Sequence, residues 1–350
     1  MILHVIKSNI YSGAENVVCQ IIKGLSDSRQ FVYMAPHGPI EDKLKSLGLY
    51  DCYRGIDKLT VSAIRDAVDD LHPDIVQAHD FTAGVLCGLA LKGRVPLISH
   101  IHCNPLWLKN RFHPKSVSYL YASRYFSRIV AVSDAVIGEY CYKDRLTCPV
   151  TVLGNPFSSE LVRSKAEIDD GDDLKSDILY VGRFNEAKNP LGAIDIAKRY
   201  IDTLPDDADI KVRMVGAGEL LPEAMEYVSG NNLDRYFSFE GFQDNVYKFM
   251  KNTRILLMPS IFEGFGLVAL EAMSLGVPVV CSGVGGLSDI VDDSCGYICR
   301  SNAEYIDALT ELTTDESVYS NKSSGAITRA EEFDNIAEYL NRIDAIYEEL

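Results

Sequence analysis

Short apolar runs rich in β-branched residues alternate with longer stretches of helical hydrophobic spacing along the first half of the chain. One helical pattern begins after Ser12 and another continues through Ala90. The apolar runs cover residues 2–6, 31–35, 75–78, 96–100, 129–132 and 151–153. Such alternation is typical of βαβ units, in which parallel strands form one sheet and helices cover it. We therefore predict an α/β domain in this half.

The same alternation starts again after a polar break over residues 164–177. Five aspartates, at positions 169, 170, 172, 173 and 177, make this break typical of a solvated linker. Strand-like runs then cover residues 178–181, 211–215, 236–240, 255–259 and 278–282. The last stretch, 333–350, spaces its apolar residues as a helix with one buried face does. The predicted fold class is α/β, with two doubly wound Rossmann-like domains facing a ligand-binding cleft.

Length and composition agree with two domains in an untargeted soluble protein. The chain has 350 residues, of which 47% are hydrophobic, and this exceeds what one core usually holds. It contains no run of about 18 apolar residues, and its N-terminus leads directly into a strand-like run. Nine scattered cysteines indicate reduced thiols in a cytoplasmic protein. Cys295 and Cys299 have no second ligand pair at zinc spacing, so we predict no metal site.

The net charge of −16 argues against a nucleic-acid partner, because binding the phosphates of a nucleic acid needs a basic face. The charge is unevenly distributed. Residues 1–133 hold 15 Lys+Arg and 11 Asp+Glu, a net of +4, which leaves residues 134–350 at −20. No acidic residue occurs between Phe81 and Ser133. The basic residues of this acid-free segment are Lys92, Arg94, Lys109, Arg111, Lys115, Arg124 and Arg128.

Aromatic residues are interleaved with the basic residues of the acid-free segment. They are Trp107, Phe112, Tyr119, Tyr121, Tyr125 and Phe126. Basic and aromatic side chains together suit a membrane surface or a lipid-linked pyrophosphate acceptor. We predict that Trp107, Lys109, Arg111 and Lys115 form such a surface. The alternative is an ordinary amphipathic helix with its tyrosines in the core.

The densest chemical signal follows the apolar run at 255–259. Gly264 and Gly266 lie at the start of a helical pattern, and Glu263 and Glu271 flank them. Glycines let a ligand approach the backbone, and a helix start offers unpaired N–H groups to a phosphate. Carboxylates accept hydrogen bonds from the hydroxyls of a ribose or sugar ring. The pattern favours a nucleotide-sugar site, and its alternative is a glycine-rich helix start with two solvated acids.

Two further turns follow strands in the same half. Arg183 and Lys188 come after the run at 178–181 and combine a fork of donors with a point charge, which suits a diphosphate leaving group. Gly216 and Gly218 come after the run at 211–215, without the third glycine of a dinucleotide fingerprint. Taken alone, the first turn is also explained as a pair of exposed basic residues, and the second as a tight glycine turn after a strand.

Together these segments resemble the nucleotide-binding domain of family 4 of the retaining glycosyltransferases, which have the two-domain fold called GT-B and include enzymes of bacterial polysaccharide assembly. The family carries two glutamates separated by seven residues, which is the spacing of Glu263 and Glu271. The resemblance implies that Arg183 and Lys188 bind the donor diphosphate. It also implies that Glu263 contacts the donor sugar and that Glu271 binds the ribose.

The resemblance implies four further contacts to the donor in the same half. Backbone N–H groups of Gly266 and Leu267 would meet the phosphate and the sugar. The strand end that carries Phe242 would hold the base, and Gly216 would also contact the donor.

The first half resembles the family more loosely. Gly13 matches a glycine loop and would approach the donor phosphate, although Ser12 stands where a second glycine is common. His102 matches a histidine near the reacting sugar. His100 is assigned to the other face of the strand and to a structural role.

The resemblance implies an acceptor-side domain of residues 1–160, to which a terminal helix at 335–350 crosses back, and a nucleotide-sugar-binding domain of residues 161–334. The implied reaction moves a hexose from a nucleotide-diphosphate sugar, such as a UDP-sugar, to a hydroxyl acceptor with retention. It needs no metal or other cofactor. The expected setting is surface-polysaccharide assembly, in exopolysaccharide or capsule, in the cytoplasm or peripherally at the inner membrane face.

No carboxylate is identified by its spacing as a covalent nucleophile, so we favour a front-face route in which the leaving phosphate accepts the proton of the acceptor. Alternatives are a sugar-nucleotide epimerase of the same fold and a non-catalytic nucleotide-sugar-binding partner subunit. A dinucleotide oxidoreductase is disfavoured because no G-x-G-x-x-G follows the first strand.

Overall fold

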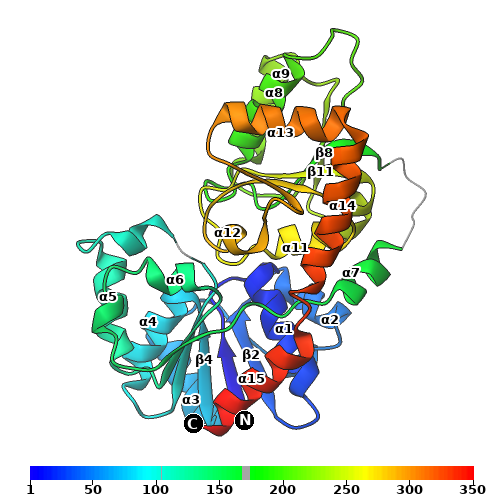
Figure 1. Cartoon of the computed structure of the whole chain (residues 1–350). Helices are drawn as coiled ribbons and strands as arrows, with labels where there is room; N and C mark the ends of the chain where they lie inside the picture. Colours follow the sequence, from blue (N-terminus) through cyan, green and yellow to red (C-terminus); the bar gives the residue numbers. More distant parts are fainter. Residues whose placement is uncertain (104, 168–173) are drawn as a thin grey trace. The chain divides into compact units, whose positions relative to one another are not determined.

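The computed structural model describes residues 1–103, 105–167 and 174–350, which divide into two compact units (Figure 1). Unit 1 comprises Met1–Pro156 and Asn335–Leu350, and unit 2 comprises Phe157–Asp334. The first boundary therefore falls after Pro156, rather than after the predicted residue 160. The reason is local, since the backbone N–H of Ser159 donates to the Asp334 carboxylate at 2.9 Å and ties this segment to the other end of unit 2.

Unit 1 is a seven-stranded parallel sheet with the strand order β3-β2-β1-β4-β5-β6-β7. Its strands are β1 (Ile2–Val5), β2 (Phe31–Pro36), β3 (Tyr53–Ile56), β4 (Ile75–His79), β5 (Leu97–Ile101), β6 (Arg128–Ala131) and β7 (Val150–Val152). Its helices are α1 (Gly13–Leu25), α2 (Ile40–Ser46), α3 (Val61–Leu71), α4 (Asp80–Leu91), α5 (Pro114–Ser123), α6 (Asp134–Gly138) and α15 (Ile336–Glu348), with the short 3-10 turns η1 (Tyr50–Cys52), η2 (Leu106–Lys109) and η3 (Lys143–Arg145).

Unit 2 is a six-stranded parallel sheet with the order β10-β9-β8-β11-β12-β13. Its strands are β8 (Ser176–Val181), β9 (Val212–Val215), β10 (Phe237–Gly241), β11 (Thr253–Met258), β12 (Val279–Ser282) and β13 (Gly296–Cys299). Its helices are α7 (Ser159–Ala166), α8 (Pro190–Ile201), α9 (Leu221–Gly230), α10 (Tyr247–Lys251), α11 (Leu267–Met273), α12 (Leu287–Ile290), α13 (Asn302–Thr314) and α14 (Glu316–Glu331). The predicted α/β class with two doubly wound units is confirmed.

Each sheet has one point at which the strand order reverses. In unit 1 it lies between β1 and β4, and in unit 2 between β8 and β11. In open parallel sheets, ligands bind at the carboxyl ends of the strands beside such a reversal. The segments that follow these four strands carry Gly13 and Asp80, each the first residue of a helix, and Arg183 and Glu263, which lie in loops.

Two strands and part of the linker differ from the sequence prediction. β3 and β13, which the sequence prediction missed, each form a sheet edge. Arg54 interrupts the apolar residues of β3, and β13 has only four residues, of which the first is a glycine. Residues 164–166 of the predicted linker belong to α7, and β8 begins at Ser176. The linker aspartates 169, 170, 172 and 173 lie outside the described residues.

The terminal helix α15 completes the core of unit 1. Its residues Tyr339, Ile343, Ile346 and Tyr347 are buried in the same cluster as residues of α1. In Figure 1 this helix lies over the strands of unit 1 and ends near the chain's N-terminus. Among the described residues, no helix combines the length and the apolar character needed to span a membrane.

Ile343→Ala should lower the free energy of unfolding by about 2–4 kcal/mol, because it leaves a cavity in a fully buried position. Asn341→Ala is the matched control, since Asn341 is exposed on the same helix and its truncation should change stability little. Denaturant unfolding of both variants tests this. Equal effects would show that α15 does not contribute to the core as described.

Candidate functional site

Arg183 and Lys188 lie in the loop between β8 and α8. The hydroxyl of Tyr180, on β8, donates to the carbonyl oxygen of Arg183 at 3.1 Å and holds the start of the loop against its strand. Asn189 ends the loop in the left-handed region at φ 53°, and its side chain accepts from the N–H of Gly192 to cap α8. The guanidinium of Arg183 is exposed and makes no hydrogen bond or ion pair with any described residue.

The loop after β11 is fastened to this first loop. A backbone hydrogen bond of 2.9 Å runs from the N–H of Ile261 to the carbonyl of Ala187. The ammonium of Lys188 and the carboxylate of Glu263 then form an ion pair, with side chains only 18% and 12% exposed. Little water reaches the pair, which strengthens its attraction relative to a surface pair.

This ion pair changes the role predicted for Lys188. The sequence prediction offered two cations to a diphosphate, but the structure neutralises Lys188 with Glu263. Of the two predicted cations, Arg183 is the one that presents an unpaired charge. A diphosphate that binds Lys188 has to compete with Glu263 for it.

Gly216 is required by packing between two loops. Its φ is 139°, and a Cβ there would lie 1.9 Å from the carbonyl oxygen of Gly182, which no side chain tolerates. The N–H of Gly216 donates to the carbonyl of Gly241 at 2.8 Å. The next residue, Phe242, is 56% exposed. Gly216 and Phe242, both predicted donor contacts, therefore lie at the same edge of the unit 2 sheet.

The chain enters α11 through a backbone conformation that favours glycine. Gly266 adopts φ 105°, a left-handed conformation that favours glycine independently of any ligand. Leu267 is the first residue of α11, so its N–H is among those that have no acceptor within the helix. Glu271 lies more than one turn further along the same helix.

Glu271 has a partner that the sequence does not mark. The hydroxyl of Tyr247, on α10, donates to the Glu271 carboxylate at 3.1 Å. Burial raises the pKa of Glu271 to about 7, although the hydrogen bond from Tyr247 and the charge of Lys165 both lower it. The protonation of Glu271 is thus set by residues from two other helices, which lie in no recognisable motif.

In unit 1, Gly13 is the first residue of α1. A Cβ at this position would meet nothing within 4 Å, and its backbone is not left-handed. Neither strain nor packing explains this glycine, unlike Gly216 and Gly266. The hydroxyl of the preceding Ser12 donates to the carboxylate of Glu15 at 2.5 Å.

His102 belongs to a buried cluster of histidines at the ends of β1, β4 and β5. One ring nitrogen of His79 lies 2.9 Å from His102, and its other ring nitrogen lies 3.0 Å from His4. The assignment of His100 to the opposite strand face was wrong. Residues two apart on a strand share a face, and the ring centroids of His100 and His102 are 4.1 Å apart. The sequence prediction missed His79 and His4, although His79 directly follows the predicted strand at 75–78 and His4 lies within the predicted strand at 2–6.

Burial governs the ionisation of these rings. It lowers the pKa of His4 to about 3 and holds the pKa of His79 and of His100 well below the ordinary value. It also lowers the pKa of His102, against the charge of Asp80, which raises it. The cluster is therefore neutral at physiological pH.

The same cluster holds the side chains best placed to bind a metal. Ring nitrogens of His79, His100 and His102 lie within 4.8 Å of one another. This geometry does not test the expectation that the reaction needs no metal, which stays a prediction.

The acid-free segment is partly core and partly surface. Tyr119 and Phe126 are buried, as the core alternative predicted. Trp107 is half-buried, edge-on to Phe81 and stacked on His113, and its predicted place in a membrane or acceptor surface stays a prediction.

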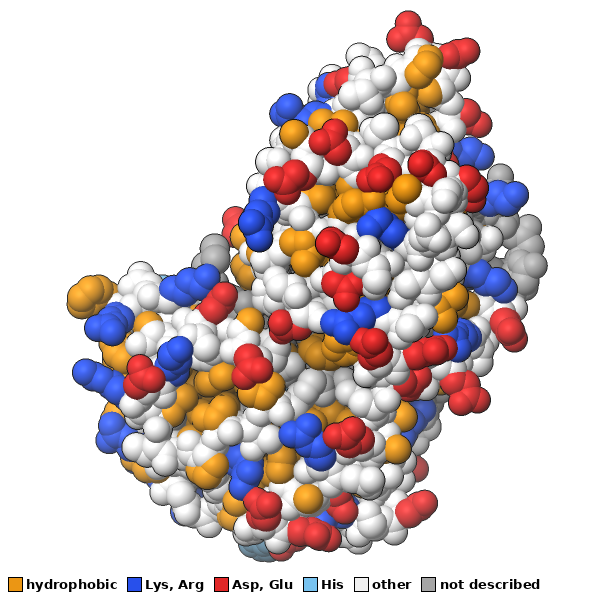
Figure 2. Space-filling view, in the orientation of Figure 1, with side chains coloured by type: hydrophobic (Ala, Val, Ile, Leu, Met, Phe, Trp, Pro, Cys, Tyr) orange, Lys and Arg blue, Asp and Glu red, His pale blue; other side chains and the backbone are white. Residues whose placement is uncertain are grey.

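The exposed residues of the acid-free segment include both basic and apolar side chains. Phe112 is 92% exposed, and Val117 and Tyr121 are exposed on α5. Lys109 pairs with Glu139 at 3.3 Å, whereas Arg111 and Lys115 are exposed. Figure 2 shows basic and hydrophobic side chains gathered where Figure 1 places α5.

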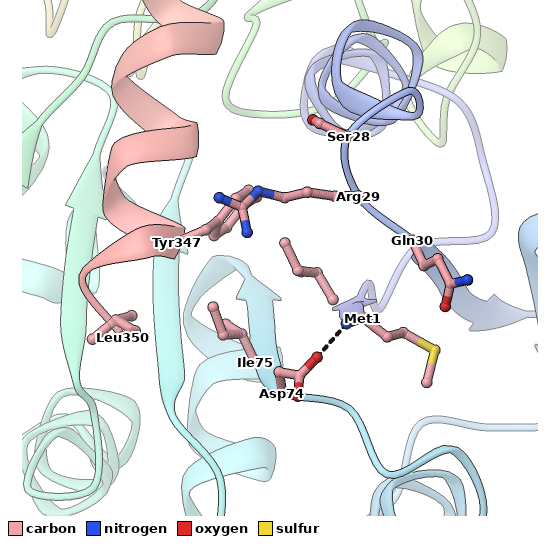
Figure 3. A pocket seen from close by; sticks show the side chains of 9 residues that line it. Met1, Ser28, Arg29, Gln30, Asp74, Ile75, Tyr347 and Leu350 are labelled. Atoms are coloured by element: carbon pink, nitrogen blue, oxygen red, sulfur yellow. Dashed lines mark hydrogen bonds and ion pairs between the residues drawn. The ribbon is translucent and has the colours of Figure 1, made fainter.

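A cavity of about 420 Å³ lies at the opposite ends of the unit 1 strands (Figure 3). Its two cationic groups, the amino group of Met1 and the side chain of Arg29, are already paired with Asp74 and Asp344. It is therefore poorly suited to an anionic ligand, and it lies away from the strand ends that carry the candidate residues.

Two family models together match most of the chain. Residues 11–161 match the model described as Glycosyltransferase Family 4, and residues 175–315 match the model described as Glycosyl transferases group 1. A solved structure, Anabaena HepE in complex with UDP and glucose, covers 100% of this chain and 99% of its own, with a TM-score of 0.84 and 19% identity. The chain is a GT-B glycosyltransferase.

Curated relatives of this GT-B glycosyltransferase are also named as glycosyltransferases. One is the UDP-Gal:alpha-D-GlcNAc-diphosphoundecaprenol alpha-1,3-galactosyltransferase of Escherichia coli, 28% identical over 69% of the chain. Another is an uncharacterized glycosyltransferase of Methanocaldococcus jannaschii, 29% identical over 64% of the chain. The matches span 67% and 59% of these relatives' own lengths.

Glu271→Gln should remove part of the pH dependence of stability between about pH 4.5 and 7. The folded state keeps a proton on Glu271 up to about pH 7, whereas the unfolded chain releases it near its ordinary pKa of 4.5. The folded state therefore binds more protons across this window, and stability decreases as pH rises through it. Denaturant unfolding at several pH values should give a flatter profile for the variant.

Tyr247→Phe provides the complementary test. It removes a hydrogen bond that lowers the pKa of Glu271, so the same pH-dependent loss of stability should extend to higher pH than in the parent. A Glu271→Gln profile as steep as that of the parent would contradict this account of the carboxyl group.

Proposed function

We propose that this GT-B chain transfers a hexose-type sugar from a nucleotide-diphosphate sugar to a hydroxyl acceptor with retention of configuration. The observation that carries the proposal is the Lys188–Glu263 ion pair beside the open guanidinium of Arg183. These groups follow β8 and β11, the strands at the reversal of the unit 2 sheet. A diphosphate and an attached sugar need such neighbouring cationic and anionic groups.

The names of similar proteins support a uridine donor. The Escherichia coli relative is named for UDP-Gal, and the Anabaena structure contains UDP and glucose. The exposed ring of Phe242 gives a flat surface for a base at the end of β10. UDP-sugars are therefore the donors to test first.

The ion pair suggests how donor binding prepares the site. A diphosphate that takes the ammonium of Lys188 releases the carboxylate of Glu263 at the same moment. That carboxylate then accepts hydrogen bonds from the sugar hydroxyls, which satisfies the charge that Lys188 had neutralised. Binding of a free nucleoside diphosphate leaves the carboxylate without this compensation.

The chemistry requires stabilisation of a leaving group that gains negative charge. As the bond from the anomeric carbon to the phosphate oxygen breaks, Arg183, Lys188 and the first N–H groups of α11 face the growing charge. The acceptor oxygen bonds to the same face of the anomeric carbon, and its proton passes to the leaving phosphate oxygen. No metal is needed for this neutralisation.

Lys188→Ala should lower the turnover of the accepted UDP-sugar by roughly 10²- to 10³-fold, the loss expected for one preorganised stabilising group. The measurement is release of the nucleoside diphosphate by slow hydrolysis across a panel of UDP-, GDP- and ADP-sugars, with thermal shift as a report of binding. Glu263→Ala should also reduce turnover. It should not weaken UDP binding, because it removes the competitor for Lys188.

Two exposed residues of unit 2 provide matched controls. Lys251→Ala and Glu226→Ala remove the same types of charge from α10 and α9 and should behave like the parent. A new sugar nucleotide without release of the diphosphate would favour an epimerase. Binding without turnover by any acceptor would favour a partner subunit, and absence of any nucleotide binding would overturn the site.

We further propose a lipid-linked saccharide acceptor, met at the inner face of a membrane by the exposed part of the acid-free segment. This assigns the chain to the cytoplasm and to surface-polysaccharide assembly. Support comes from the exposed Phe112, Val117 and Tyr121 beside Arg111 and Lys115, which pair apolar and basic groups as an interface requires. The Escherichia coli relative is also named for a diphosphoundecaprenol acceptor.

Replacement of Lys109, Arg111 and Lys115 by Gln should reduce binding to anionic vesicles, since each basic residue near a charged membrane contributes about 1 kcal/mol. Phe112→Ser should reduce binding even at high salt, because its contribution is apolar. Sedimentation with phosphatidylglycerol vesicles measures both. Lys23, Lys45 and Lys58, replaced together, form the charge-matched control outside this segment. Equal losses of vesicle binding in the two triple variants, or no binding by the parent, would contradict the proposed membrane contact of the acid-free segment.

A further inference from the structure

Three histidines of unit 1 bring their ring nitrogens together at the carboxyl ends of two neighbouring strands. His79 ends β4, His100 lies on β5, and His102 directly follows β5. The two strands pair in parallel with His79 opposite His100. One ring nitrogen from each residue lies within 4.8 Å of the other two, and His79 Nδ1 is 2.9 Å from His102 Nε2. Two adjacent strands thus assemble three imidazoles.

His100 has a ring nitrogen whose bonding capacity is unused. Its Nδ1 lies 2.9 Å from the side-chain amide of Gln77, whereas its Nε2 is shielded from water and makes no hydrogen bond to any described residue. A buried polar atom without a partner is uncommon in a folded protein, and a bound ion or water is one physical explanation. Nε2 is therefore the His100 atom available to a ligand.

The second nitrogens of His79 and His100 have the outer partners that metal-binding histidines use. Such a histidine binds the ion through one nitrogen and hydrogen-bonds through the other, which fixes the orientation of its ring. If His79 binds through Nδ1, its Nε2 faces His4 Nδ1 at 3.0 Å. If His100 binds through Nε2, its Nδ1 faces Gln77, whose amide can present its oxygen to an N–H. Both rings thus keep a hydrogen-bonded neighbour while the other nitrogen coordinates.

His102 is fixed beside an acidic neighbour. Its backbone N–H donates to Asp80 Oδ1 at 3.1 Å, and Asp80 is the first residue of α4, which starts directly after β4. The negative charge of this carboxylate favours a cation nearby. His102 is also only half-buried, unlike His79 and His100, so the cluster reaches water on the side of His102.

The geometry points to a binding site for a divalent transition metal of the zinc class, held by His79, His100 and His102. Imidazole nitrogens suit zinc, copper, nickel and cobalt, and three histidines with an open fourth position are an established ligand set for zinc. Zinc–nitrogen bonds of about 2.0–2.1 Å require roughly 3.4 Å between ligand nitrogens. His79 and His102 therefore move apart slightly when the ion binds, and His100 moves closer.

The ion is separate from the neutralisation of the leaving group, which the proposed function assigns to unit 2. Its consequence for the reaction rests on that proposed function. An ion that holds the ring of His102 withdraws it from the sugar near which the family resemblance places it. Zinc should therefore inhibit transfer, and chelation should restore it. The alternative is a cluster joined only by hydrogen bonds, with a water at His100 Nε2.

The test is titration of the full chain with Zn²⁺ alone, after dialysis against a chelator, with a chromophoric chelator as competitor. One equivalent should bind. His79→Gln, His100→Gln and His102→Gln should each weaken binding by at least about 100-fold, because loss of even an outer partner of a metal ligand costs roughly 10- to 100-fold. His37→Gln and His72→Gln change exposed histidines elsewhere in unit 1 and are the matched controls, with the affinity of the parent expected.

The nine cysteines are the main competing ligands, and Co²⁺ distinguishes them from imidazole. A cobalt–thiolate bond gives strong charge-transfer absorption in the near ultraviolet, whereas cobalt held by imidazoles gives only the weaker visible bands of the metal. The parent should show the second spectrum with one equivalent of Co²⁺. Cys103→Ser, which changes the thiol next to His102, should leave it unaltered. This measurement does not depend on the folding of any histidine variant.

Absence of a stoichiometric site for Zn²⁺ and Co²⁺ in the parent would overturn the inference. So would an affinity that the three histidine variants leave unchanged, or a cobalt spectrum with thiolate absorption. One bound equivalent of zinc that leaves transfer unchanged would overturn the inhibitory role. A parent that turns over no donor, with or without chelator, would instead contradict the proposed function, and the titration would still decide the metal site.

Discussion

The ion pair between Lys188 and Glu263 is the interaction around which unit 2 arranges its candidate site. It joins the loops after β8 and β11, and the backbone supports it, since Ala187 accepts from Ile261 and the amide of Asn189 donates to Pro259 at 3.0 Å. Loss of one partner of a shielded pair strongly destabilises the folded protein, because the other charge is left buried without a partner. Each charge therefore neutralises the other. Only a ligand that replaces both contacts can separate the two side chains without leaving a buried charge unpaired.

The glycines of the molecule separate into two kinds. Gly216 and Gly266 are required by left-handed backbone, and Gly216 also by its contact with the carbonyl of Gly182. Gly13 has an ordinary backbone and open space around its Cβ position. A glycine-rich motif in a sequence therefore does not by itself indicate a ligand. At Gly13 neither structural reason applies, and the approach of a ligand there stays a prediction.

The central strands and the loops that follow them could be predicted because a parallel strand buried on both faces is a continuous apolar run. The edge strands β3 and β13 were missed, because Arg54 interrupts the short apolar run of β3 and β13 is a four-residue strand that begins with a glycine. Motif residues such as Arg183 and Glu263 could be found from their place after a strand. Their partners could not, because Tyr247 meets Glu271, and His4 meets His79, only after separate elements pack together. The fold follows from local patterns, whereas the protonation states of the site follow from long-range contacts.

The charge distribution constrains how an anionic donor can bind. Residues 134–350 carry a net charge of −20, so the far field of this part of the chain repels a diphosphate. While Glu263 neutralises Lys188, this lysine does little to oppose that field. Arg183 supplies a single exposed positive charge. In the proposed site, attraction therefore comes at short range, from the fork of Arg183, from the N–H groups at the start of α11 and from the proposed exchange of partners at Lys188. Such a site selects a ligand by the fit of a diphosphate together with its sugar, because a phosphate alone gains too few of these contacts to overcome the repulsion.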